Sequence, residues 1–248
     1  MYKKAAKAAK IGNFFLNIMV AILILFMLSY GGYSLWDTYR IYHNGFADEE
    51  LLTLKPVENE EELDFIELRR KIPNTCAWLT VDDTHIDYPV VQGKDDMEYI
   101  SKNVYGDYSV SGAIFLSCLN KADFSDGYNL VYGHNMKNGA MFGDVVKFAE
   151  QKYFEKHKTG TLYLPDKNYK IKFFACIRVN ASDAMIYDPE SIGKDNRDSL
   201  LEYIKEQAVQ YRKMKITSEE SLIAFSTCAE SETNGRVVLV GKLVEEKD

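Results

Sequence analysis

Three hydrophobic patterns follow one another along the 248 residues of the chain. The first is a stretch from Ile11 to Trp36 that carries no charged residue and follows four lysines. About 20 apolar residues in a helix cross a bilayer core of ~30 Å, so residues 11–36 are predicted to form one transmembrane helix. The lysines before it predict a cytoplasmic tail over residues 1–10 and an extracellular position for the remainder.

A cleaved signal peptide is the alternative for this segment. Its apolar core would usually be shorter and would end in a small-x-small cleavage site. The sequence offers Ser29, Gly31 and Gly32 but no A-x-A pattern. We therefore favour an uncleaved signal anchor, which predicts a single-pass protein of the cell membrane.

The second pattern, over residues 37–72, places apolar residues at helical spacing between charged ones. It contains DEELLTL and ENEEELDFIELRRKI, and Pro56 interrupts it. This spacing predicts membrane-proximal surface helices that pack on the following domain.

The third pattern, over residues 73–248, consists of short apolar runs between turn residues, which is typical of strands. Eight strands are predicted, and eight short strands indicate a barrel or a sandwich, so the fold class is mainly β. The predicted strands are Ala77–Val81, His85–Val91, Ala113–Leu116, Asn129–Tyr132, Thr161–Leu164, Tyr169–Val179, Leu222–Thr227 and Val237–Val244.

Two helical patterns interrupt these strands. Met141–Glu150 predicts a short helix. Asp195–Lys213 predicts a longer one, and its apolar residues share one face. The residues of that face are Leu200, Leu201, Ile204, Ala208 and Tyr211.

The charge of the chain excludes one class of partner. The 37 acidic residues exceed the 30 basic ones, and five of the basic residues lie in the first forty positions together with only one acidic residue. Residues 41–248 therefore carry a net charge of −11. Because phosphate binding needs a basic surface, no nucleic-acid partner is expected.

The four cysteines are Cys76, Cys118, Cys176 and Cys228, and none forms a C-x-x-C or zinc-like spacing. Two disulfides are possible outside the membrane, but three of the cysteines lie in apolar runs that also suit buried thiols. We expect Cys118 and Cys176 to be reduced and buried. No metal site and no cofactor are expected, because H-x-H, H-E-x-x-H and EF-hand patterns are absent from the sequence.

Three polar residues stand at the ends of predicted strands. His134 follows the run NLVYG, Cys228 closes the run IAFSTC, and Arg236 opens the next strand. A thiolate is a nucleophile, an imidazolium can protonate a leaving amine, and a guanidinium can hold an oxyanion. Taken singly, each residue also fits a packing or surface role, so spacing alone leaves the chemistry open.

Several separated blocks, in the same order, resemble the motifs of class B sortases, the membrane-anchored cysteine transpeptidases of Gram-positive bacteria. The blocks are DYPVVQGKDDMEYI, GAIFLSC, NLVYGHNMKNGAMF, FSTC and GRVVLVGKL, and the resemblance covers about residues 78–243. The resemblance implies an eight-stranded sortase β-barrel over residues 73–248. It also implies N-terminal helices and a long helix before the strand that bears the cysteine.

The resemblance also implies residue roles. His134, Cys228 and Arg236 match the catalytic residues of the family, and Tyr132, Ser226, Ile100 and Ile186 match the lining of its peptide groove. The loop after Cys228 is shorter than is common, and Ala229 with Glu230 stands where the family often has an acidic residue directly after the nucleophile.

The implied reaction is a two-step transpeptidation. Cys228 would cleave the C-terminal sorting signal of an exported protein after Thr, through a thioester, and an amine of a peptidoglycan precursor (lipid II) would accept the acyl group. Polymerisation of pilin subunits is an alternative within the family. A papain-like cell-wall peptidase fits less well, because there the cysteine precedes the histidine and opens a helix. A non-catalytic surface module with a buried Cys228 is the remaining alternative.

Overall fold

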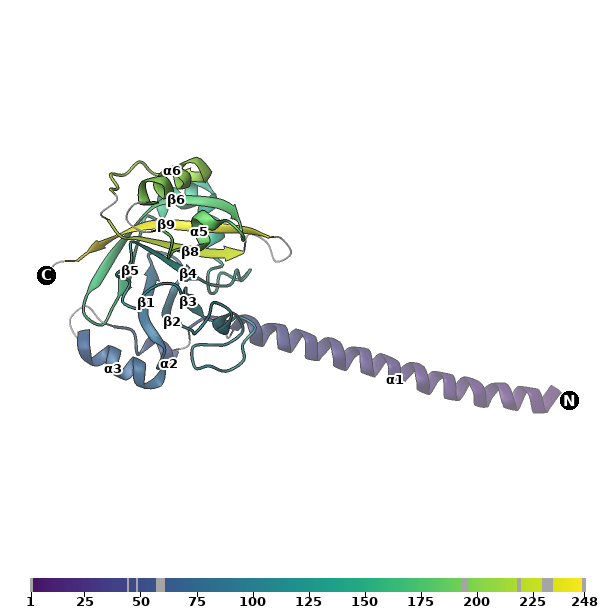
Figure 1. The fold of residues 1–248 in the computed structure, drawn as a ribbon. Coiled ribbons are helices and arrows are strands. Elements are labelled where there is room, and N and C mark those ends of the chain that lie inside the picture. The colour runs from purple at the N-terminus through teal and green to yellow at the C-terminus, as the bar shows by residue number, and fades with distance from the viewer. Residues whose placement is uncertain are drawn as a thin grey trace. The chain divides into compact units, whose positions relative to one another are not determined.

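The computed structural model describes residues 2–43, 45–47, 49–56, 61–192, 196–217, 220–228 and 234–246, with the backbone alone at residues 8, 61–64 and 228. The chain divides into two compact units, residues 1–43 and 44–248, and each is described by itself (Figure 1).

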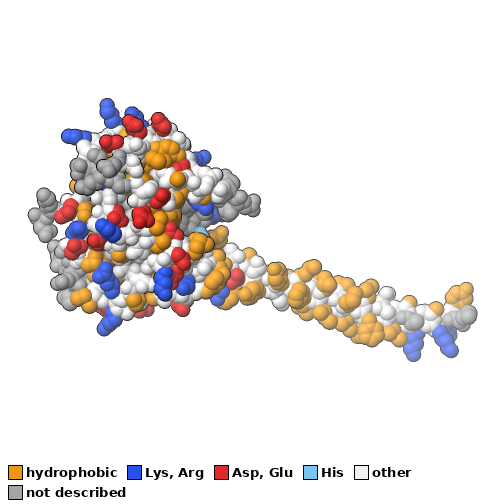
Figure 2. Space-filling model, in the orientation of Figure 1, with side chains coloured by type: hydrophobic (Ala, Val, Ile, Leu, Met, Phe, Trp, Pro, Cys, Tyr) orange, Lys and Arg blue, Asp and Glu red, His pale blue; other side chains and the backbone are white. Residues whose placement is uncertain are grey.

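The first unit is one helix, α1 (Tyr2–His43). It is long and apolar enough to cross a membrane, and it is therefore a candidate membrane span. Figure 2 shows hydrophobic side chains along the middle of the helix and basic side chains near its N-terminal end. The helix continues beyond both ends of the predicted 11–36 segment, since neither the lysines before it nor DTYRIYH after it contains a helix breaker.

The second unit is built on a closed β-barrel. Eight strands follow one another around it in the order β5-β1-β2-β3-β4-β8-β9-β6, and β6 closes the ring by pairing with β5. Their bounds are β1 (Thr75–Val81), β2 (Asp87–Gln92), β3 (Ile114–Leu116), β4 (Tyr128–Tyr132), β5 (Thr159–Tyr163), β6 (Asn168–Asn180), β8 (Leu222–Cys228) and β9 (Gly235–Glu245). The predicted mainly-β, eight-stranded fold is confirmed, and each predicted strand overlaps an observed one.

Most barrel strands are buried on both faces, which explains why they read as continuous apolar runs rather than as alternating ones. One face of each strand points into the barrel, where the Phe225 ring contacts those of Phe142 (tilted) and Phe173 (edge-to-face), with ring centroids 5.3 and 5.7 Å apart. Helices cover the opposite face of β1–β3 and of parts of β4, β6, β8 and β9.

Helices α2 (Glu49–Leu52) and α3 (Glu61–Lys71) cover one outer face. Leu68 and Ile72 are fully buried in a cluster that includes Trp78 of β1, Val91 of β2 and Phe115 of β3. The prediction of surface helices packed on a domain is therefore confirmed for these two elements.

Helix α6 (Arg197–Gln207) covers the opposite outer face, together with the short α5 (Ala184–Tyr187). Leu200 and Ile204, from the predicted apolar face, are fully buried in a cluster with residues of β4, β6, β8 and β9. The prediction that this helix continues to Lys213 was wrong. After Gln207 the chain becomes extended and forms β7 (Ala208–Tyr211), which pairs with the free edge of β6.

The physical reason is that AVQY carries strand-forming residues at alternate positions, and an unpaired stretch of β6 is available to it. Leu201 is half-buried, and Tyr211 is exposed on this added strand.

The helix predicted over Met141–Glu150 is also corrected. Met141 has a φ of 53°, in the left-handed region, so no α-helix can begin there. A 3₁₀ helix, η2 (Val145–Ala149), follows, and extended Glu150 separates it from α4 (Gln151–Lys156). A second 3₁₀ helix, η1 (Glu98–Ile100), lies in the connection between β2 and β3.

Cys76, Cys118 and Cys176 are free thiols. Cys176 is buried as expected, and Cys76 is buried as well. The prediction that Cys118 is buried was wrong: this thiol is half-buried, because it lies just past the end of β3.

Candidate active site

The candidate site is organised by a parallel pair of strands in a barrel whose strands otherwise pair mostly antiparallel. β4 and β8 run in the same direction, with Tyr132 opposite Ser226. The Gly133 amide then donates to the Ser226 carbonyl at 3.2 Å, so the two chains stay side by side at this end. Residues that follow Tyr132 and Ser226 therefore emerge together at one edge of the barrel.

The three predicted catalytic residues lie at that edge. His134 and Cys228 each stand two positions beyond the Tyr132–Ser226 pair, and Cys228 ends β8 opposite Arg236 of β9. Adjacent strands lie about 4.8 Å apart, which places the three backbone positions on neighbouring chains at the same level.

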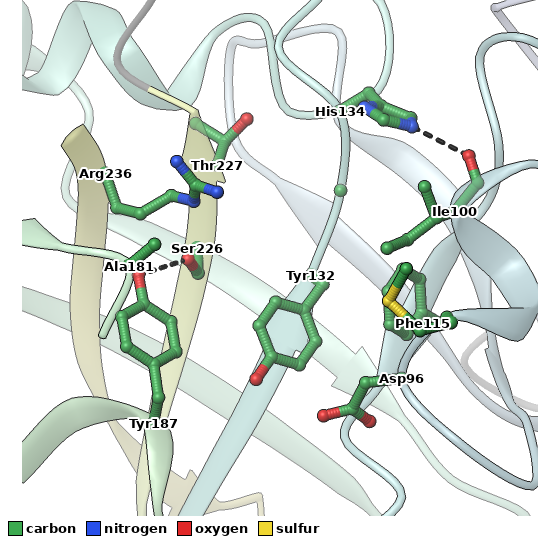
Figure 3. Close-up of a pocket in the computed structure, with 12 residues that line it drawn as sticks. Asp96, Ile100, Phe115, Tyr132, His134, Ala181, Tyr187, Ser226, Thr227 and Arg236 are labelled. Atoms are coloured by element: carbon green, nitrogen blue, oxygen red, sulfur yellow. Dashed lines mark hydrogen bonds between the residues drawn. The ribbon is translucent and has the colours of Figure 1, made fainter. Parts of the chain in front are cut away.

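A cavity of about 260 Å³ opens beside these residues (Figure 3). It is bounded by five of the residues singled out from the sequence, namely His134, Arg236, Tyr132, Ser226 and Ile100. Its other lining residues are Asp96, Met97, Phe115, Gly133, Ala181, Tyr187 and Thr227.

Ile186 is not on the cavity wall. Its side chain is fully buried in the cluster beneath α6, and its carbonyl accepts a hydrogen bond from the Tyr128 hydroxyl. The next residue, Tyr187, lines the cavity instead. The prediction found the correct segment but the wrong side of α5, because one turn of helix gives no periodicity from which to choose a face.

His134 is held by the connection between β2 and β3. Its Nε2 lies 2.7 Å from the Ile100 carbonyl oxygen. A carbonyl can only accept, so Nε2 carries the hydrogen. Gly112 lies against both Ile100 and His134 and has a φ of 61°. A Cβ at this position would lie 2.6 Å from the Ile100 carbonyl oxygen. A glycine is therefore required for the connection to approach the histidine this closely.

The turn after His134 is fastened at its far end. The Phe142 amide donates to the His134 carbonyl at 2.9 Å. Asp144, whose side chain is 1% exposed, accepts from the His85 amide and from His85 Nδ1, both at 2.8 Å, and its other oxygen lies 2.7 Å from Lys147 Nζ. Burial alone would raise the pKa of Asp144, but the hydrogen bonds from Lys147 and His85 outweigh it and lower that pKa.

Aromatic rings form much of the cavity wall. Phe115 stacks on Tyr132 with centroids 5.2 Å apart, and Tyr132 stacks on Tyr187 at 6.3 Å. The Tyr187 hydroxyl and Ser226 Oγ form a 2.8 Å hydrogen bond, drawn as a dashed line in Figure 3. Burial, followed by the negative charge of Asp96, raises the pKa of Tyr132, so this hydroxyl stays protonated.

Arg236 stands at the start of β9, between Val179 of β6 and Cys228 of β8. Its guanidinium donates to the Gly235 carbonyl at 3.1 Å and borders the cavity. A cation, an imidazole and a cysteine-bearing strand end thus meet beside a largely apolar groove, which is an arrangement that suits acyl transfer from a peptide.

Sequence reasoning did not single out Asp96, Phe115 or Tyr187. Asp96 and Asp95 are adjacent in the block GKDDMEYI, and nothing in the sequence separates the one that faces the cavity from the one that is exposed. Ala229 and Glu230, noted in the sequence as a departure from the family, lie outside the described residues. Within the described ranges, no group of three His, Cys, Asp or Glu side chains could hold a metal ion.

Comparisons with known proteins agree with this arrangement. No protein-family model matches the chain. Sortase B of Listeria monocytogenes is 28% identical over 240 residues, which cover 93% of this chain and 97% of that protein. A class B sortase of Streptococcus pyogenes involved in pilus biogenesis is 38% identical, with a TM-score of 0.68 over 75% of this chain and 100% of that one. Sortase B from the type II pilus of Streptococcus pneumoniae is 35% identical, with a TM-score of 0.63 over 73% of this chain and 98% of that one.

Proposed function

Because this chain belongs to the class B sortases, a family of cysteine transpeptidases, we propose that it joins exported proteins to the cell wall. The substrate is a C-terminal sorting signal that is cleaved after Thr, and the acceptor is an amine of a peptidoglycan precursor. The observation that supports this most is the meeting of His134 and Arg236, on one cavity, at the end of the strand that carries Cys228.

In the first step the Cys228 thiolate attacks the carbonyl carbon of the Thr. The resulting oxyanion is stabilised by the positive charge of the Arg236 guanidinium. The C–N bond then breaks, and His134 gives a proton to the departing amine, which leaves a thioester on the sulfur.

In the second step an incoming neutral amine attacks the thioester carbonyl. His134 takes the proton from this amine, the C–S bond breaks, and the thiolate is restored as the new amide forms. Because Nε2 of His134 is bonded to the Ile100 carbonyl, we assign both proton transfers to Nδ1. The groove residues Tyr132, Tyr187, Ser226 and Ile100 would hold the peptide against this centre.

We place the protein in the cell membrane as a single-pass protein with its N-terminus inside and residues 73–248 as the extracellular catalytic domain. The basic tail 1–10 precedes the anchor 11–36, and residues 37–72 link the anchor to the barrel. An apolar helix long enough to span a bilayer and the lysines before it support this orientation.

The test uses the full-length protein in detergent, mixed with peptides that contain a scissile Thr. Intact-mass spectrometry should show an acyl adduct on the wild type, released by hydroxylamine, and none on Cys228→Ala. A wild type that forms no adduct with any peptide, and whose Cys228 resists alkylation while the protein is folded, would contradict the proposal. It would favour the non-catalytic alternative.

Pilin polymerisation is the second candidate, and a specific observation favours it. One similar solved structure, at 38% identity, is a class B sortase involved in pilus biogenesis, and another, at 35% identity, is a sortase B from a type II pilus. The two functions differ in the amine that resolves the thioester. Offering the acylated enzyme a lysine-containing pilin peptide and a peptidoglycan-type amine in competition would distinguish them by the product formed.

A further inference from the structure

Asp96 places a carboxylate in the wall of the peptide cavity, away from the catalytic end. In Figure 3, Asp96 and Phe115 lie on one side of Tyr132, whereas Arg236 and Thr227 lie on the other. A group that meets Asp96 therefore belongs to a residue of the peptide other than the Thr that is cleaved.

The carboxylate is held in a fixed position by neutral donors. Ser117 Oγ donates to one oxygen at 3.0 Å, and the Cys118 amide donates to the other at 2.6 Å. Both donors stand at the end of β3, so the orientation of Asp96 is set by the barrel. The Tyr132 hydroxyl and the Cys118 thiol also share hydrogen bonds with this carboxylate. All of these donors are neutral, so they orient the carboxylate without neutralising its negative charge.

Among the ion pairs of the described residues, none includes Asp96. Its carboxylate also raises the pKa of the neighbouring Tyr132 hydroxyl and of the Cys118 thiol, and in both cases burial is the larger cause. An anion in a partly desolvated wall attracts a cation more strongly than one on the open surface does.

The surroundings also select the shape of that cation. Phe115 and Tyr132 present stacked ring faces beside Asp96, and Met97 and Ile100 extend the apolar wall. A lysine or arginine carries an aliphatic stem that can lie against such a wall, with its charged end beyond it.

On the basis of the proposed transpeptidase function, we propose that Asp96 is a specificity-determining residue that selects sorting signals with a basic side chain before the scissile Thr. The basic side chain forms an ion pair with the Asp96 carboxylate and lays its stem along Phe115 and Tyr132. A hydrogen bond to a charged group in such a place corresponds to about a 10- to 100-fold preference.

The experiment measures kcat/KM of the full-length enzyme with fluorogenic peptides that contain one Thr. At each position before the Thr, in turn, a lysine peptide is compared with a norleucine peptide, which has a stem of similar length and no charge. The quantity of interest is the ratio of the two values. We expect a ratio of at least about 10 at one position with the wild type.

Asp96→Asn should reduce this ratio to about 1–3, whatever it does to the absolute rates, because it removes the charge and keeps the shape. Asp95→Asn is the matched control. Asp95 is exposed and is not a lining residue, so its variant should keep the wild-type ratio.

Two results overturn the inference while leaving the proposed function intact. One is a wild type that cleaves the peptides with a lysine-to-norleucine ratio of kcat/KM near one at every position. This result can be interpreted without any variant. The other is a preference for lysine that Asp96→Asn leaves unchanged. If Asp96 served only to hold the end of β3, its substitution would change both peptides alike and the ratio would not move. Failure of the wild type to acylate with any peptide would instead contradict the transpeptidase function itself.

Discussion

The clearest test of the geometry around His134 is Asp144→Asn, at the far end of the turn that the histidine begins. Asp144 is buried and accepts from the His85 amide at 2.8 Å. A hydrogen bond to a charged acceptor contributes about 1.5–3 kcal/mol. The His85 ring and Lys147 are roughly half exposed, so the ring hydrogen bond and the Lys147 ion pair add only about 0–1 kcal/mol each.

An asparagine keeps one acceptor and loses the charge, so we expect a loss of about 1–3 kcal/mol. For a domain of this size that corresponds to a fall in Tm of roughly 3–10 °C. The assay is thermal unfolding of the full-length protein, followed by near-UV circular dichroism. Asp166→Asn, which removes an exposed carboxylate from the turn between β5 and β6, is the control and should leave Tm nearly unchanged.

The effect of pH gives this prediction a direction. The pKa of Asp144 is lowered in the folded state, so the stability that its charge contributes is present above the unfolded pKa of about 3.9. That stability is lost as the pH falls through the lower, folded value. The difference in Tm between wild type and variant should therefore be full at neutral pH and shrink below about pH 4. A difference that is absent at neutral pH, or that stays constant into acid, would refute the reasoning.

The remaining predictions concern the core, the groove and the thiols. Phe148→Ala removes a fully buried ring and should lower the free energy of unfolding, measured in denaturant, by about 3–5 kcal/mol. A decrease below about 1 kcal/mol would mean that neighbouring side chains move in to fill the cavity. Tyr187→Phe and Ser226→Ala should each lower the free energy of unfolding by about 0.5–1.5 kcal/mol. Because both substitutions delete the same hydrogen bond, their effects should be non-additive in a double-mutant cycle, and full additivity would argue against that bond. Burial raises the pKa of Cys76 and of Cys176 to about 12, so neither should react with iodoacetamide at pH 8 until the protein is unfolded, and rapid alkylation of the folded protein would contradict their burial.

The sequence predicted strands well where both faces of the strand are buried. β8 begins with the apolar run LIAF because Phe225 fills the barrel while Ala224 lies beneath α6, and such a run indicates a covered strand or a buried helix. The order of the strands around the barrel could not be read in the same way, since pairing between distant segments leaves no local pattern.

The errors were of three physical kinds. β7 was predicted as the end of a helix because its stabilisation comes from a free edge of β6, which is a tertiary feature. Ile186 was chosen in place of Tyr187 because a single helical turn does not specify a face. Asp96 was missed because its orientation depends on donors about twenty residues further along the chain.

The parallel pairing of β4 with β8 also bears on how the protein matures. Asn129 Nδ2 donates to the Leu222 carbonyl 93 residues further along the chain, so the two halves of the site come from segments that are far apart in the barrel sequence. Contacts between such distant segments are slow to form, because loop closure must precede them. β8 and β9 are also the last strands to be synthesised. Enzymatic activity should therefore be one of the last properties to return on refolding, after much of the secondary structure, and a chain that is still folding carries a cysteine with no histidine beside it.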